Sequence, residues 1–196
     1  MLPLHLPPML WSSDAAWGEI SRRPPSLIAT AFGLALPAAM VPPAILLHAT
    51  DLGSAHYLPA LSASGWQFVE LALIAAQLVG FLMVLWLVRA VAGTRGAKAS
   101  ARDAFMLTTV SLLPLWLSSL ALIQDEILPV LAIPILAIGA SVALLKRGAR
   151  CVLGIREDIV ALELGLVAIQ GGVLAWAATM VVLLIPGLPA APHPAN

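Results

Sequence analysis

The chain has 196 residues, of which 61% are hydrophobic and only 10% are charged, and its mean hydropathy is +0.99. A soluble domain is usually about half apolar and about a quarter charged, so the composition argues against a soluble globular, disordered or nucleic-acid-binding protein. The ten basic and ten acidic residues leave no net charge, and the single cysteine, Cys151, argues against a disulfide framework or a cysteine-rich metal site.

The first predicted element is a short amphipathic helix near the N-terminus. Ser13 or Asp14 can cap this helix, and Trp17 and Ile20 then fall on one face of it. An amphipathic helix of this kind lies in the plane of the membrane surface. We therefore expect residues 1–26 to form a cytoplasmic, interfacial segment.

Five apolar stretches follow, each long enough to cross a bilayer. A spanning helix needs about 20 residues, and lipid offers no partner for a backbone amide outside a helix. The predicted spans are residues 27–49, 66–88, 104–123, 127–145 and 159–185. The sequence thus predicts an all-α protein, a polytopic membrane helix bundle of five transmembrane helices in residues 27–185, followed by a disordered tail at 186–196.

All ten basic residues lie before the first span or in the loops after the second and fourth spans. Because basic loops stay on the cytoplasmic side, we expect the N-terminus inside and the C-terminus outside. This pattern predicts a multi-pass membrane protein with its basic loops on the cytoplasmic side. Nine of the basic side chains can contact anionic lipid head groups, namely Arg22, Arg23, Arg95, Lys98, Arg102, Lys146, Arg147, Arg150 and Arg156.

Four polar side chains lie inside the apolar stretches, where a functional role is the default hypothesis. Glu70 and Gln77 share one face of the second span, and Glu163 and Gln170 share one face of the fifth. The glutamates fall near opposite ends of their spans, whereas both glutamines fall near the centre. We predict a Gln77–Gln170 hydrogen bond between antiparallel helices, worth roughly 0.5–2 kcal/mol. The alternative is a polar path for a proton or solute.

A stripe of small residues runs along the fifth span at alternating spacings of four and three: Ala161, Gly165, Ala168, Gly172, Ala175 and Thr179. Small side chains allow another helix backbone to approach closely. The stripe predicts packing within the bundle, with a homo-oligomer contact as the alternative.

Prolines interrupt the first span at Pro37, Pro42 and Pro43. Proline removes an amide donor and disfavours helical torsions in the residue before it, so the adjacent pair Pro42 and Pro43 is expected to break the helix. A broken helix can build a substrate site in a transporter, although simple kinks are tolerated in membrane helices.

Metal and catalytic motifs are not apparent in the sequence. His48, Asp51 and His56 cluster at the outer end of the first span, but their spacing matches no metal motif, and a solvated loop is the preferred interpretation. The chain has no phosphate-binding loop, zinc-protease motif or nucleophile elbow. We therefore predict no metal, no cofactor, no catalytic residue and no nucleic-acid partner.

Short motifs between about residues 14 and 180 resemble those of a known family. They are Asp14-Ala-Ala-Trp17-Gly-Glu-Ile20, Leu36-Pro37 with Val41-Pro42, Leu113-Pro114-Leu115-Trp116-Leu117, Ile127-Leu-Pro129, Arg147-Gly148 and Gly154-Ile155-Arg156-Glu157-Asp158. In these motifs the chain is similar to the bacterial Yip-domain family, relatives of the Ypt/Rab-interacting membrane proteins. The resemblance implies five spans, a cytoplasmic N-terminus, a location in a bacterial cytoplasmic (inner) membrane and no enzymatic activity.

Together these observations predict a non-enzymatic integral membrane protein that acts through contacts with the lipid bilayer, a membrane protein partner or a second copy of itself. Its role would lie in membrane organisation or as a complex subunit. The alternative is a small transporter or channel with a polar mid-membrane site at Gln77 and Gln170. A membrane-embedded lipid enzyme ranks last, because it needs an acid–base pair from the widely separated Glu70, Asp103 and Glu163.

Overall fold

The computed structural model describes residues 17–18, 22, 25–51, 63–94, 100–124, 126–154, 163 and 165. Nearly all of them are helical, and none of them forms a strand. Four helices are long and apolar enough to cross a membrane: Leu27–His48, Ser64–Thr94, Ala101–Ile123 and Leu128–Val152. These helices confirm an all-helical, multi-pass membrane character. The fifth predicted span lies outside the described residues except for Glu163 and Gly165, which are both helical.

The first span is an irregular helix that nevertheless continues from Leu27 to Asp51. It consists of α3 (Leu27–Thr30), the π-helical turn η1 (Ala31–Ala35), α4 (Leu36–Ala39) and α5 (Val41–Asp51). The wide π turn directly precedes Pro37, which has no amide to donate. At the junction of α4 and α5, the amide of Met40 donates to the carbonyl of Leu36 at 3.1 Å, and the amide of Ala44 donates to that of Met40 at 3.1 Å.

Pro42 and Pro43 lie in the first turn of α5, where a helix needs no amide donor. Both rings are buried. The expected break is therefore a local turn at Met40, and the hydrogen bonds that flank it keep the segment one continuous span.

The other three spans are regular over most of their length. They are α6 (Ala63–Thr94), α7 (Ala101–Leu117) with the 3₁₀ turn η2 (Ser118–Ile123), and α8 (Ile127–Val152). Ser100 begins α7 with a capping box, in which its hydroxyl accepts from the amide of Asp103 and the Asp103 carboxylate accepts from the amide of Ser100. Pro114 and Pro134 both lie inside helices that continue past them.

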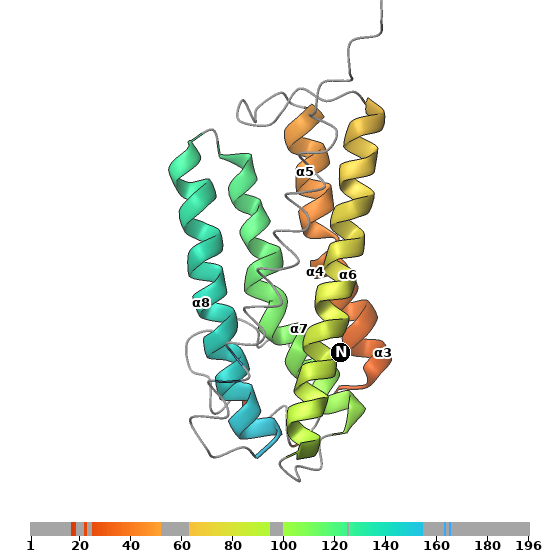
Figure 1. The fold of residues 1–196 in the computed structure, drawn as a ribbon, viewed down its shortest axis with the longest axis vertical. Helices are drawn as coiled ribbons and strands as arrows, with labels where there is room; N and C mark the ends of the chain where they lie inside the picture. The colour runs from red at the N-terminus through yellow and green to blue at the C-terminus, as the bar shows by residue number, and fades with distance from the viewer. Residues whose placement is uncertain are drawn as a thin grey trace, which may run out of the picture.

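The helix α7 is the centre of the arrangement (Figure 1). It packs against α6, α8 and the elements of the first span, and it is the most buried of the four spans. Phe81 of α6 lies against Phe105 and Trp116 of α7, with ring centroids 5.3 and 6.2 Å apart. On a different face of α7, Leu107 fits beside Gly148 of α8, so α6 and α8 flank α7.

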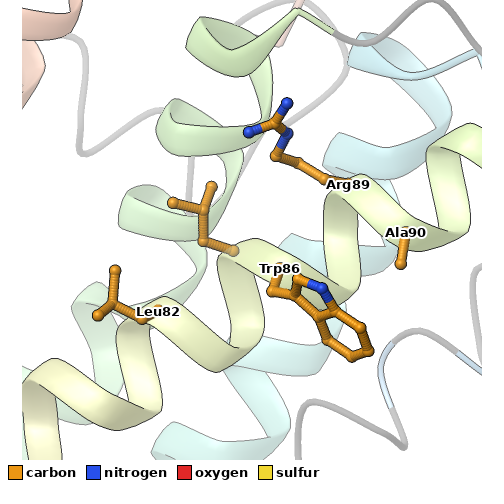
Figure 2. A pocket seen from close by; sticks show the side chains of 5 residues that line it. Leu82, Trp86, Arg89 and Ala90 are labelled. Atoms are coloured by element: carbon orange, nitrogen blue, oxygen red, sulfur yellow. The ribbon is translucent and has the colours of Figure 1, made fainter.

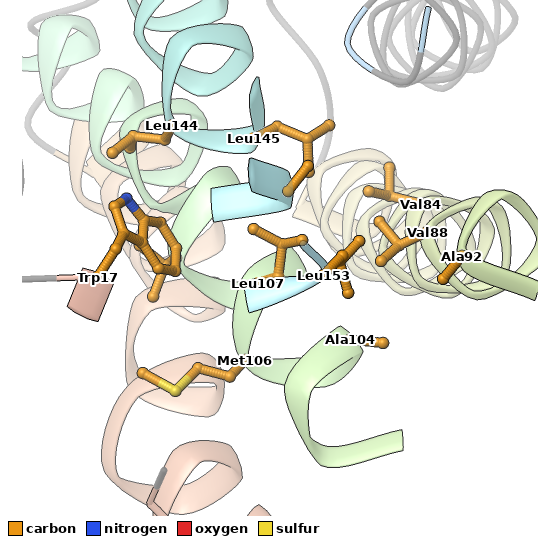
Figure 3. Close-up of a cluster of buried hydrophobic side chains, with 12 residues drawn as sticks. Trp17, Val84, Val88, Ala92, Ala104, Met106, Leu107, Leu144, Leu145 and Leu153 are labelled. Atoms are coloured by element: carbon orange, nitrogen blue, oxygen red, sulfur yellow. The ribbon is translucent and has the colours of Figure 1, made fainter. Parts of the chain in front are cut away.

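The buried core joins these helices near one end of the bundle, and Figure 3 shows its side chains. Trp17 is fully buried there, a contact that the sequence did not predict. It packs at the backbone of Gly148, where a side chain would collide with the indole ring and with Leu107. The apolar face of the N-terminal segment therefore contacts protein at this residue, because a glycine leaves room for the ring.

Candidate functional site

The first candidate feature is a cationic end of the bundle. The helices alternate in direction, so the C-terminal end of α6, the start of α7 and the C-terminal end of α8 meet at one end (Figure 1). This end carries Arg89, Arg102, Lys146, Arg147 and Arg150. Within the described ranges, the opposite end carries no lysine or arginine.

One of these cations also joins two elements. The Nε atom of Arg102 donates to the carbonyl of Pro25, just before α3. This contact ties the start of the central helix to the start of the first span.

A second feature is a layer of uncharged polar groups inside the bundle, which we call the polar layer: Gln77, Thr108, Ser111 and Ser141. Both amide atoms of Gln77 and the hydroxyls of the other three are buried, and in the described part of the chain they have no hydrogen-bond partner. An unpaired buried polar group costs about 1–3 kcal/mol, so these four side chains require a functional or packing explanation.

The hydroxyls of the polar layer differ from the neighbouring hydroxyls of α7 and η2. Thr109 donates to the carbonyl of Phe105 at 2.9 Å, and Ser118 donates to that of Leu115 at 2.7 Å. Such bonds within a helix are the usual way to satisfy a hydroxyl in an apolar setting. Thr108 and Ser111 lack them and share one face of α7, between the directions of α6 and α8.

Ser111, Ser141 and Gln77 lie within about one turn of one another along the bundle, whereas Thr108 lies about one turn nearer the cationic end. Since Leu107 meets Gly148, counting along the antiparallel helices places Ser141 level with Pro114, one turn from Ser111. Gln77 lies one turn along α6 from Phe81, whose ring contacts Trp116. The sequence placed Gln77 near the middle of its span, but it gave no prediction for the three hydroxyls, because isolated Ser and Thr barely change the hydropathy of an apolar stretch.

The remaining predicted residues divide between described and undescribed parts of the chain. Gln170, Ala161, Ala168, Gly172 and Ala175 lie outside the described residues, so the Gln77–Gln170 bond and the stripe as a whole stay predictions. Gly165 is buried, and a Cβ atom there would lie 2.9 Å from Cγ1 of Val142 on α8. Close approach to another helix is the role that the small-residue stripe predicts for this glycine.

The acidic residues are not assembled into one site. Glu70 is half-buried near the start of α6, and Asp103 lies at the start of α7, which is the opposite end of the bundle (Figure 1). Glu163 is exposed. His48 is also exposed, while the side chains of Asp51 and His56 lie outside the description. Among the described residues, no three histidine, cysteine or acidic side chains group as metal ligands.

A third feature is a groove on the outer face of α6, which we call the α6 groove. It has a volume of about 410 Å³ and is lined by Leu82, Leu85, Trp86, Arg89 and Ala90. Figure 2 shows the Trp86 ring and the Arg89 side chain leaving the helix in different directions. Trp86 is 66% exposed. Neither residue was predicted as part of a site, because Trp86 lies at the end of the apolar stretch 66–88 and Arg89 counted only as one of the basic residues that set the orientation.

Comparison with known proteins finds no match: no family model, no curated protein and no solved structure resembles this chain at a significant level.

Proposed function

We propose that the protein is a non-enzymatic, multi-pass protein of a bacterial inner membrane that acts through contacts with lipid or with another membrane protein. The proposal includes a fifth span in residues 159–185, an N-terminus on the cytoplasmic side and kinship with the Yip-domain proteins. A role in membrane organisation, or as a subunit of a larger complex, follows from it.

The observation that carries this proposal is the position of the α6 groove beside the cationic end. Large apolar side chains such as Ile28, Phe32, Leu71 and Leu128 cover the outer faces of the spans, which suits contact with acyl chains. The described lysines and arginines gather at one end of these faces. Basic residues near a membrane surface attract anionic head groups. The basic side chains at this end of the bundle are therefore placed to contact lipid head groups.

Extraction in a mild detergent tests the proposal. Purified protein is expected to retain phospholipid or a co-purifying membrane protein, both detectable by mass spectrometry. Recovery of a bare monomer, with neither lipid nor protein attached, would contradict the proposal.

The second candidate function is a small transporter or channel, and the polar layer is the observation that favours it. These unpaired polar groups inside the bundle, spread over about two helical turns, offer hydrogen bonds to a neutral solute or to water. In this alternative the centre of the bundle is hydrated, whereas in the first proposal it is dry and packed.

Cysteine labelling separates the two functions. In a Cys151→Ala background, Gln77→Cys is exposed to a membrane-impermeant thiol reagent in intact membranes. Leu78→Cys is the lipid-facing control, since Leu78 is 58% exposed on the same helix, and His48→Cys is the water-accessible control. Protection of position 77, like that of position 78, supports the first proposal. Labelling of position 77 at the rate of position 48 supports transport.

A further inference from the structure

We propose that the α6 groove binds one anionic phospholipid from the leaflet at the cationic end of the bundle. The phosphate would pair with Arg89, and an acyl chain would lie along the groove beside Leu82, Leu85 and Trp86. This inference rests on the proposed membrane function and makes it specific, because it assigns a binding site and a ligand class to named residues.

The shape of the groove follows from helix geometry. Side chains four residues apart form ridges on a helix surface. One ridge contains Leu82, Trp86 and Ala90, and the other contains Leu85 and Arg89. The small Ala90 ends the first ridge beside the large indole ring of Trp86 (Figure 2), so the space between the ridges widens toward the cationic end.

The groove faces outward because the opposite side of α6 is used for packing. Val84, Val88 and Ala92 of the same helix are buried in the core, whereas Leu82 is 52% and Trp86 66% exposed. Leu82 and Arg89 lie seven residues apart, or roughly 10 Å along the helix axis. An acyl chain with its glycerol and phosphate can follow this path from the apolar end to the charged end.

The charge at the end of the groove favours a phosphate. Arg89 is exposed, and among the described residues it has no hydrogen-bond or ion-pair partner. Arg102, at the same end, is instead bonded to the carbonyl of Pro25. A planar guanidinium recognises phosphate through two parallel hydrogen bonds, and an exposed tryptophan one turn deeper prefers the level just below the head groups.

The preference for an anionic lipid over a zwitterionic one comes from the surrounding charge. Arg102, Lys146, Arg147 and Arg150 lie at the same end of the bundle as Arg89. Their combined potential favours a head group with a net negative charge. Phosphatidylglycerol is therefore expected to bind more tightly than phosphatidylcholine with the same acyl chains.

Lipid titration followed by native mass spectrometry tests the site. Delipidated full-length protein in detergent is titrated with phosphatidylglycerol and, separately, with phosphatidylcholine. Arg89→Gln is expected to weaken the first phosphatidylglycerol bound by about fivefold to tenfold, since a charge-assisted pair is lost. Arg89→Lys should lose part of that affinity, because it keeps the charge without the planar fork.

Arg22→Gln is the matched control, because Arg22 is also exposed and its removal lowers the net charge by the same amount. It should change phosphatidylglycerol binding by less than about twofold. Equal weakening by Arg89→Gln and Arg22→Gln would show a diffuse attraction and overturn the site, as would an unchanged affinity in Arg89→Gln. Lipid retained by the extracted wild-type protein without dependence on Arg89 would overturn this inference alone, whereas no retained lipid or partner would overturn the proposed function.

Discussion

The helices α6 and α7 lie side by side but have opposite relations to their surroundings. The more apolar of the two, α6, is the least buried span, whereas α7 is the most buried span and carries buried threonines and serines. In water the more apolar helix would occupy the core. In a bilayer, lipid solvates apolar side chains as well as protein does, so the most apolar helix can lie outside and the small polar residues mark the inside.

The largest difference in stability between a buried and a lipid-facing position is expected for substitutions of Gly148. Gly148→Leu places a side chain against Leu107 and Trp17, and such overpacking should destabilise the fold by about 3 kcal/mol or abolish it. Gly139→Leu is the control on the same helix, because no atom lies within 4 Å of a Cβ there. Thermal unfolding in detergent measures both, and an equal loss in the two variants would contradict the packing described.

A smaller effect is expected for Leu107→Ala, which leaves a cavity between α7 and α8. Leu107 is fully buried, so the substitution should lower the free energy of unfolding by about 2 kcal/mol. This is the lower end of the range for core leucines, because the unfolded side chain is in lipid and no transfer to water is involved. Leu78→Ala on the exposed face of α6 should change stability by less than about 0.5 kcal/mol. Similar losses at both positions would show that exposure in this structure does not report lipid contact.

Loss of the capping box of α7 ranks next. Ser100→Ala removes the hydroxyl that accepts from the amide of Asp103 and should cost about 1 kcal/mol. Ser100→Thr keeps a hydroxyl that can accept from the amide of Asp103 and donate to its carboxylate, and it should restore most of the loss. Unfolding midpoints of the three proteins measure the effect, and equal midpoints for Ser100→Ala and the wild type would remove the capping argument.

The smallest effect is expected for Gln77→Leu. No hydrogen bond of its amide is present among the described residues, so the substitution should be neutral or slightly stabilising, within about 0.5 kcal/mol. A double-mutant cycle with Gln170→Leu measures any pairing between the two glutamines. A coupling of roughly 0.5–2 kcal/mol would establish the bond predicted from the sequence and contradict an unpaired amide.

The positions of four spans could be predicted from hydropathy, because length and apolarity alone decide whether a helix can cross a bilayer. Hydropathy could not show which helix is central, since lipid-facing and buried positions are both apolar. The burial of Trp17 could not be predicted for a related reason: its neighbours Leu107 and Gly148 lie far away in sequence. Gln77 stood out as an amide in an apolar stretch, whereas Ser111 and Ser141 became notable only when their burial was known.

The packing of Trp17 against α8 also has a consequence for biosynthesis. The indole packs against α7 and α8, yet Trp17 leaves the ribosome long before either helix has been made. The N-terminal segment must therefore wait, with its ring against lipid or another protein, until α8 has entered the membrane. A contact made by a residue that is translated before all four spans is thus among the last contacts to form.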